Sequence, residues 1–185
     1  MRIITGKAKG ITLKTLEGEN TRPTSERVKE AVFSMIQFDI EDRTVLDLFS
    51  GSGQMALEAL SRGAASATLI DKSRDAVSII KHNAQKTKLE DKCTIFQADY
   101  LDFIKRSNGK KFDIIFCDPP YALKMYKPAF AAMLEYGLLK PTSFIICESG
   151  EDTVFEGDRE LAAKFAIEKQ SRYGKTYITI FRPVL

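Results

Sequence analysis

The segment Asp118-Pro119-Pro120-Tyr121, which follows the apolar run 112–117, has the residue types best suited to chemistry in this sequence. Each proline fixes its own φ angle and restricts the residue before it, so the acid and the ring are held where a buried strand ends. A carboxylate and a proline carbonyl accept two N–H bonds, and a tyrosine ring stacks on a flat group. All four residues are therefore candidate catalytic residues for a planar group bearing an NH2, such as the exocyclic amine of a nucleobase.

A second candidate site is the glycine turn Gly51-Ser52-Gly53, which follows an apolar, β-branched strand and precedes a helical pattern. Glycines allow a sharp turn and the close approach of a ligand. With Ala56 the spacing fits only the looser form of the dinucleotide fingerprint. Asp47 lies inside the preceding strand, where it would repel a pyrophosphate but attract a cationic ligand, such as one with an α-amino group. The alternative is that Asp47 only caps the turn.

Two further strands end in an acid. Asp71 follows Gly53 at a spacing close to the ~20 residues expected for an acid that binds a ribose diol. Asp99 follows the strand 93–97 and is placed to accept a hydrogen bond from an adenine amine. Both acids also suit a helix N-cap, and the two roles are compatible. Because ligands of open α/β sheets bind at the carboxyl ends of the strands, we expect these acids to gather there with Asp118.

These side chains need a sheet whose strands end at one edge, and the hydrophobic pattern predicts one. Strands are expected at 44–49, 67–71, 93–97, 112–118, 143–148, 165–171 and 176–182, and helices at 53–62, 73–88, 99–106, 125–136 and 157–163. This alternation predicts an α/β fold with a mostly parallel sheet and helices on both faces. The short turn 173–175 makes the last two strands an antiparallel hairpin.

The first 40 residues do not follow the alternation. Apolar segments at 2–4 and 11–13 flank a basic turn that contains Lys7 and Lys9, which predicts a small β-hairpin. A helix follows, with Thr24 or Ser25 as its N-cap and one apolar face. We expect Arg22 and Arg27 near its start to grip phosphates close to the active cleft. For the individual lysines, a solvated basic surface is the simpler reading.

Composition narrows the class of protein. The chain has 185 residues, of which 44% are hydrophobic and 29% charged, with a net charge of +3 and a pI of about 8.7. This predicts one soluble domain, or one domain with an extension. No apolar run approaches the ~20 residues of a membrane span, and no signal peptide is expected. Three cysteines in predicted buried strands indicate a reducing, cytoplasmic compartment, and a single histidine (His82) without a C-x-x-C pair argues against a metal site.

The net charge is lower than that of a strong nucleic-acid binder, but it is unevenly spread. Residues 72–111 carry ten Lys or Arg against five Asp or Glu, and residues 164–182 carry five against one. A basic rim around an acid-lined cleft is compatible with RNA binding through phosphates.

Six segments of the chain occur in the order in which a known family has them. They are Arg2-Ile3-Ile4-x-Gly6, Thr21-Arg22-Pro23-Thr24, Arg27-Val28-Lys29-Glu30-Ala31, the stretch 47–53, the stretch 58–64, and Asp118-Pro119-Pro120-Tyr121. From residue 2 to about 181 the chain resembles the bacterial RsmD-type 16S ribosomal RNA guanine-N2 methyltransferases. The block 21–24 is the most specific part, because the glycine turn and the segment 118–121 alone would indicate only an amino-methyltransferase.

The resemblance implies a Rossmann-like class I methyltransferase fold with a seven-stranded sheet, and S-adenosylmethionine as cofactor. It divides the chain into an N-terminal RNA-binding extension, a β-hairpin and helix over 1–40, and an S-adenosylmethionine-dependent methyltransferase domain over 41–185. The implied cofactor contacts are Asp47, Phe49, Gly51, Gly53, Asp71, Lys72, Asp99 and Tyr100. The RNA contacts expected are Arg22, Thr24, Arg27, Lys7 and Lys9.

The implied reaction is methyl transfer to a guanine N2 in 16S rRNA, with S-adenosylhomocysteine as product and no metal. The partner is that RNA, within a small-subunit particle or an assembly intermediate, and the protein is expected to be a monomer. Three local departures concern the stretch 54–56, the residues before Arg27, and Asp71 in place of a glutamate. Two alternatives stay open: N6-adenine methylation of RNA or DNA, and a non-catalytic RNA-binding assembly factor. A nicotinamide dehydrogenase is more distant, since no proton-relay residue is evident near the strand ends.

Overall fold

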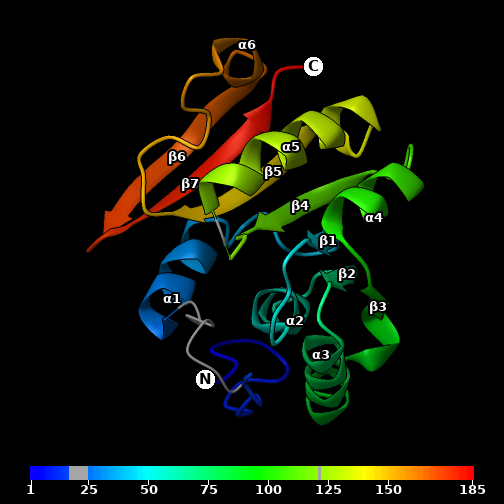
Figure 1. Ribbon diagram of the computed structural model, residues 1–185. Coiled ribbons are helices and arrows are strands. Elements are labelled where there is room, and N and C mark those ends of the chain that lie inside the picture. The colour runs from blue at the N-terminus through cyan, green and yellow to red at the C-terminus, as the bar shows by residue number, and fades with distance from the viewer. Residues whose placement is uncertain (17–24, 121) are drawn as a thin grey trace.

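The computed structural model describes residues 1–16, 25–120 and 122–185, and its centre is a seven-stranded sheet in the order β3-β2-β1-β4-β5-β7-β6 (Figure 1). The first five strands in this order are parallel, and β7 runs antiparallel to both β5 and β6. The strands are β1 (Thr44–Asp47), β2 (Ser66–Asp71), β3 (Cys93–Gln97), β4 (Phe112–Cys117), β5 (Leu139–Ser149), β6 (Phe165–Tyr173) and β7 (Thr176–Pro183). The mostly parallel sheet and its C-terminal hairpin confirm the sequence prediction.

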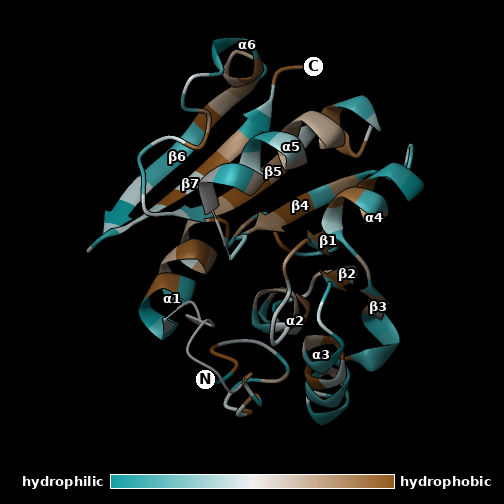
Figure 2. Ribbon diagram, in the orientation of Figure 1, coloured by the Kyte–Doolittle hydropathy of each residue, from teal (hydrophilic) through white to brown (hydrophobic). Residues whose placement is uncertain are grey.

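Helices cover both faces of the sheet. They are α1 (Glu26–Met35), α2 (Gln54–Ser61), α3 (Arg74–Lys86), α4 (Tyr100–Arg106), α5 (Ala122–Glu135) and α6 (Arg159–Ala162). Neighbouring strand residues point to opposite layers, so Val45 packs with α1, α2 and α3, while Leu46 packs with α4, α5 and α6. Figure 2 shows the apolar central strands between these layers and the hydrophilic edge strand β6. Within the described ranges, no helix combines the length and hydropathy needed to cross a bilayer.

The observed elements differ from the predicted ones mainly at their ends. Strand β1 stops at Asp47, so Leu48 and Phe49 already belong to the turn, and β5 begins at Leu139, four positions before the predicted start. A short 3-10 turn, Glu90–Lys92, was not predicted. Cys117 and Cys147 are buried as expected.

The expectation of burial is wrong for Cys93, which is only half-buried. Its strand, β3, is the last strand of the sheet on that side, and within the described part of the chain it pairs only with β2. The side chains of an edge strand are covered less completely than those of a central strand.

The N-terminal segment forms a narrow hairpin that packs on α2. Only Arg2 and Thr12 pair as a β-bridge, and the turn between them is fixed by the backbone N–H of Lys7, which donates to the Ser61 carbonyl at 2.9 Å. Gly6 has a φ of +86°, and a Cβ there would lie 1.8 Å from the same carbonyl oxygen. Only glycine fits this contact, because any side chain would collide with backbone.

A buried charge cluster joins the N-terminal segment to the rest of the molecule; it is formed by Lys29 of α1, Glu58 of α2 and Arg62, the C-cap of α2. The side chains of Lys29 and Glu58 are 0% exposed, and their nitrogen and oxygen lie 3.5 Å apart. Glu58 also accepts from the guanidinium of Arg62 at 2.9 Å and from the backbone N–H groups of Ile4 and Thr5 at 2.8 and 3.0 Å. Burial lowers the pKa of Lys29, and the neighbouring Glu58 carboxylate opposes that shift. The hairpin, α1 and α2 therefore share one polar network, with the buried Lys29–Glu58 pair at its centre.

Candidate active site

The carboxyl ends of β1 and β4 lie side by side in the middle of the sheet, where the strand order reverses. On one side of this point β1 leads to β2 and β3, and on the other β4 leads to β5. Ligands of open α/β sheets bind in the crevice outside such a reversal point. Asp47 is the last residue of β1, and Asp118 directly follows Cys117, the last residue of β4. The structure thus brings these two predicted site residues to the place where a ligand is expected.

A third acid, Glu148, continues this line of carboxylates. Parallel pairing aligns Cys117 of β4 with Cys147 of β5, so the residues that follow them, Asp118 and Glu148, are neighbours on strands about 4.8 Å apart. We call Asp47, Asp118 and Glu148 the carboxylate row. Glu148 was not among the predicted site residues, although it ends a buried apolar run, as the other candidate acids do.

Burial and neighbouring negative charges raise the pKa values of two members of the row, Asp47 and Asp118. Asp47 is 4% exposed, and loss of hydration raises its pKa to about 7, against the effect of a hydrogen bond from the backbone of Phe49. The pKa of Asp118 rises to about 8, first through desolvation and then through the charges of Glu148 and Asp47. The residue as a whole is exposed, but protein atoms crowd its carboxyl group, which accounts for the desolvation. A row of this kind attracts a cation, since a positive ligand would relieve the repulsion.

The glycine turn connects the row to Asp71. The carboxylate of Asp71 accepts from the backbone N–H groups of Gly51 and Ser73, both at 2.8 Å. Each oxygen keeps a further lone pair for a hydroxyl donor. Gly51 has a φ of +54° and open space where a Cβ would stand, whereas a Cβ on Gly53 would lie 3.2 Å from Leu69. A ligand can therefore approach Gly51 closely, while Gly53 is required by packing and by the start of α2.

Aromatic rings and a capping acid lie at the neighbouring strand ends. The rings of Phe49 and Tyr100 are 5.0 Å apart, and Tyr100 is buried. Asp99 is the N-cap of α4 and accepts from Leu101 N at 2.9 Å through one oxygen. The capping role that its position allowed is thus present, and its contact with a cofactor stays a prediction. Lys72 is exposed at the end of β2.

The remaining predicted pocket and RNA residues differ in exposure, and some of them are not described by the structure. Pro119 is buried and Pro120 is exposed. The predictions for Tyr121, Arg22 and Thr24 fall outside the described residues.

Arg27, in the first turn of α1, is exposed, and Ser25 is the N-cap of this helix, since its hydroxyl accepts from Val28 N at 3.2 Å. Lys7 and Lys9 are also exposed, but their turn packs against Ser61. Ser61 is the last residue of α2, an eight-residue helix about 12 Å long whose first residue lies beside the glycine turn. The structure therefore does not bring the two lysines to the strand ends; in Figure 1 their segment lies beside α2.

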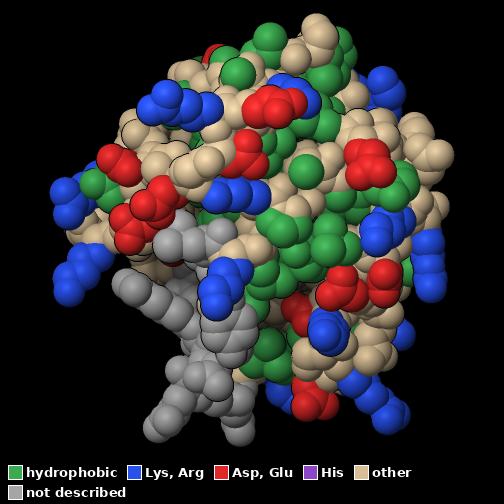
Figure 3. Space-filling model, turned by 45° about the horizontal axis from the view of Figure 1, so that its top comes forward, with side chains coloured by type: hydrophobic (Ala, Val, Ile, Leu, Met, Phe, Trp, Pro, Cys, Tyr) green, Lys and Arg blue, Asp and Glu red, His purple; other side chains and the backbone are tan. Residues whose placement is uncertain are grey.

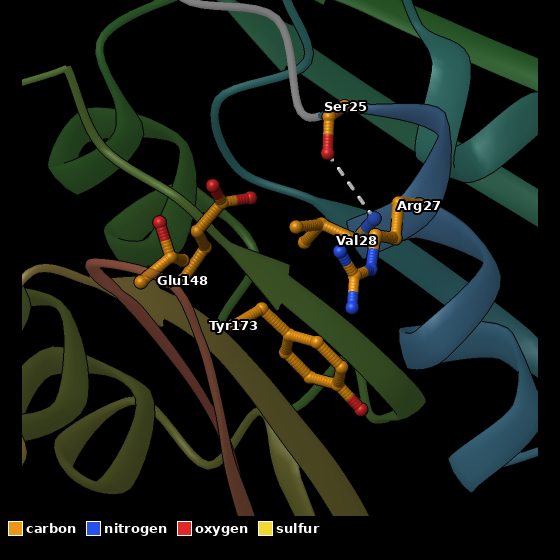
Figure 4. A pocket seen from close by; sticks show the side chains of 7 residues that line it. Ser25, Arg27, Val28, Glu148 and Tyr173 are labelled. Carbon is orange, nitrogen blue, oxygen red and sulfur yellow. Dashed lines mark hydrogen bonds between the residues drawn. The ribbon is translucent and has the colours of Figure 1, made fainter.

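A hollow of about 210 Å³ opens next to the carboxylate row. We call it the α1–β5 hollow; it is lined by Ser25, Arg27, Val28, Glu148, Tyr173, Gly174 and Thr176. Figure 4 shows Arg27 and Glu148 on opposite sides of it, with the ring of Tyr173 between them. The start of α1, the end of β5 and the β6–β7 turn, which are far apart in sequence, thus meet around Glu148, the neighbour of Asp118 in the sheet.

The surface around these elements carries mixed charge. Figure 3 shows Lys and Arg side chains spread around one face with Asp and Glu among them, so no patch of a single sign covers it. Among residues 1–16, 25–120 and 122–185, no three His, Cys, Asp or Glu side chains gather in a way that could hold a metal ion.

Comparison with known proteins places the chain among bacterial relatives. The model of the family described as "Conserved hypothetical protein 95" matches residues 1–182. "Ribosomal RNA small subunit methyltransferase D" of Haemophilus influenzae is 34% identical over 154 residues, which cover 82% of this chain and 80% of that protein. The protein of the same name from Escherichia coli (strain K12) is 31% identical over 184 residues, covering 98% and 89%.

Solved structures agree with this relationship. The structure described as "Putative methyltransferase yhhF from Escherichia coli" has a TM-score of 0.84 and 27% identity, and the match covers 99% of this chain and 97% of that one. Its fold is the class I methyltransferase fold that the sequence resemblance implied, so that expectation is confirmed. The chain belongs to the conserved hypothetical protein 95 family, whose members include the ribosomal RNA small subunit methyltransferases D, that is, the RsmD-type enzymes.

Proposed function

We propose that this protein transfers a methyl group from S-adenosylmethionine to the exocyclic N2 amine of a guanine in 16S rRNA of the small subunit. The observation that carries the proposal is the juxtaposition of Asp118 with Asp47, where one acid suits an amine and the other a cationic cofactor. Family membership supports rRNA as the substrate, and the names of the relatives support the small subunit as its source. A cytoplasmic protein that works as a monomer on a subunit or assembly intermediate is part of the same proposal.

The residues around the glycine turn fit S-adenosylmethionine, which supplies a methyl group already activated on a sulfonium. Asp47 suits the positive charge of its amino-acid part, and Gly51 offers the open side for its approach. Asp71 suits the two ribose hydroxyls, since each of its oxygens has a lone pair left. Phe49 and Tyr100 provide an aromatic wall for the adenine. Asp99 and Lys72 stand at the neighbouring strand ends, so Asp99 would accept from the adenine amine.

The segment 118–121 would hold and orient the target amine. A guanine N2 is a poor nucleophile, because its lone pair is delocalised into the ring. Hydrogen bonds from its two N–H groups to the Asp118 carboxylate and the Pro119 carbonyl favour a pyramidal nitrogen with its lone pair aimed at the methyl group. Positioning supplies much of the acceleration. Asp118 then stabilises the positive charge that develops on nitrogen and accepts its proton. The base must be unpaired or flipped to enter, and Tyr121 would stack on it.

The decisive test is methyl transfer from labelled S-adenosylmethionine to unmodified small subunits, naked 16S RNA and duplex DNA. Digestion to nucleosides and mass analysis should give N2-methylguanosine from an RNA substrate, and the position can then be mapped. N6-methyladenine as product would overturn the proposed target. No transfer to any substrate, with cofactor binding confirmed, would favour the assembly-factor alternative.

Asp47→Asn should weaken the binding of S-adenosylhomocysteine about 10- to 100-fold at pH 7.5, because a hydrogen bond to a charged group contributes about 1.5–3 kcal/mol. The pKa of Asp47 is about 7 in the cofactor-free protein, so below pH 7 the carboxyl is mostly neutral. Affinity should therefore rise with pH between about 5.5 and 7.5, a range in which an α-amino group stays largely protonated. Calorimetric titrations should show this rise for the wild type and for Asp91→Asn, a change of an exposed acid, but not for Asp47→Asn.

Arg27→Ala should weaken RNA binding and reduce the slope of log K against log salt by about one, because one phosphate contact is lost. The combination with Arg22→Ala should reduce the slope by about two. Filter binding of 16S RNA at several salt concentrations measures both. Lys140→Ala, which removes a charge at the start of β5, away from the carboxyl ends of the strands, is the control and should keep the wild-type slope. An unchanged slope in the double variant would remove the start of α1 from the RNA interface.

A further inference from the structure

Glu148 is held in a fixed position beside the residue that is proposed to bind the target amine. The register of β4 and β5 makes it the neighbour of Asp118, and its charge is the leading electrostatic influence on that carboxyl. Its own backbone is anchored on both sides, since it pairs with Ile178 of β7 and its carbonyl accepts from the hydroxyl of Tyr126. The side chain is half-buried and lines the α1–β5 hollow (Figure 4).

The hollow gives a base room to lie against this carboxylate. Its volume of about 210 Å³ is bounded on the far side by Arg27 and Val28, and the ring of Tyr173 forms another wall. The positive charge of Arg27 faces Glu148 across the opening (Figure 4). A base whose amine sits at Asp118 would therefore present the atoms next to that amine to Glu148.

The chemistry of the bases then decides which one fits. Guanine has two neighbouring donors, its N2 amine and its N1–H, so two adjacent carboxylates can both accept from it. In adenine the N6 amine lies between two acceptors, N1 and N7, and in cytosine the N4 amine lies beside the acceptor N3 and a C–H group. A second carboxylate would meet a lone pair, or no donor, on either of these bases. An unpaired acceptor facing an acceptor is costly when buried.

We propose that Glu148 is the residue that selects guanine, by accepting the N1–H of the base whose N2 amine is bound by Asp118. This inference rests on the proposed methyl transfer and adds the part of the site that distinguishes guanine from adenine. In this arrangement Asp118 would bind the exocyclic amine of any base, and Glu148 would recognise guanine in particular.

The test uses 16S RNA ligated from pieces, one of which is a synthetic segment that contains the mapped target nucleotide. The base at the target is either guanine or 2-aminopurine. The RNA is used naked or assembled into subunits, whichever form the wild type accepts. 2-Aminopurine keeps the N2 amine but has a lone pair at N1. The wild type should prefer guanine by about 100-fold or more in kcat/KM, since a site built around a substrate N–H rejects an analogue that lacks it. Glu148→Gln should lower this preference at least about tenfold, because the new amide can donate to the N1 lone pair.

Glu160→Gln, in the exposed α6 at the top of Figure 1, is the matched control and should keep the wild-type preference. Binding of S-adenosylhomocysteine by all three proteins checks that they are folded. The missing O6 of 2-aminopurine affects every protein alike, so it cancels in the comparison. A Glu148→Gln variant with the wild-type preference, or one inactive on both RNAs, would overturn the inference. Absence of N2-methylguanosine with the wild type and natural RNA would instead overturn the proposed function itself.

Discussion

Asp118→Ala is expected to lower kcat for methyl transfer by about 100- to 1,000-fold, the loss typical when one preorganised group that stabilises developing charge is removed. The variant loses both the acceptor that orients the amine and the negative charge beside the nitrogen as it becomes positive. Affinity for S-adenosylhomocysteine should stay close to that of the wild type, because Asp47 and Asp71 remain. Single-turnover transfer to the accepted RNA substrate, with calorimetry of cofactor binding, measures the two effects separately.

Two further variants sharpen this test. Asp118→Asn keeps an acceptor oxygen but not the charge, so its loss should be smaller than that of Asp118→Ala. Asp91 is an exposed acid just before β3, whereas the site lies at the carboxyl ends of the strands. Asp91→Ala should therefore transfer the methyl group at the wild-type rate. Wild-type turnover by Asp118→Ala would remove the segment 118–121 from the chemistry.

Glu58→Ala is expected to lower the free energy of unfolding by about 3–5 kcal/mol, because removing one partner of a buried pair leaves an uncompensated charge. Of the acceptors on described residues, the Arg2 carbonyl, 2.6 Å away, would be the one left for the Lys29 ammonium, which is 0% exposed. The backbone N–H groups of Ile4 and Thr5 would also lose their acceptor. Urea unfolding followed by circular dichroism measures the change.

Glu30→Ala, on the exposed side of α1, is the control and should change stability by less than about 0.5 kcal/mol. Glu58→Gln should also lower the free energy of unfolding, because it leaves the Lys29 charge unpaired. Adding Lys29→Met to Glu58→Gln should recover part of that loss, since the unpaired charge is then removed. If Glu58→Ala were as stable as Glu30→Ala, the buried charge cluster would contribute nothing to the anchoring of the hairpin.

The parts of the site that depend on topology alone could be predicted from sequence. Asp47, Asp71 and Asp118 each end or follow an apolar strand, and parallel strands connected by helices must end at the same edge of a sheet. Alternation of strands and helices therefore places these acids together without any knowledge of strand order.

Features that depend on which strands are neighbours could not be predicted. Glu148 is the last residue of the predicted strand 143–148, and only the alignment of β5 with β4 shows that it is the neighbour of Asp118. The half-burial of Cys93 has the same origin, because strand order decides that β3 is an edge. The position of Lys7 and Lys9 depends on contacts with Glu58 and Ser61, which local sequence does not encode.

The anchoring of the hairpin has a consequence for the order of events during synthesis. Ile4, Thr5 and Ala8 bond to side chains that lie 53 or 54 positions later in the chain. Domains begin to fold while the ribosome is still adding residues at about 5–20 per second, and distant contacts must wait for both partners. The hairpin therefore leaves the ribosome before its partners and is fixed only after β1 and α2 have followed. A nascent chain that ends before Glu58 would expose the basic hairpin without its fold, next to the RNA of the ribosome that is making it.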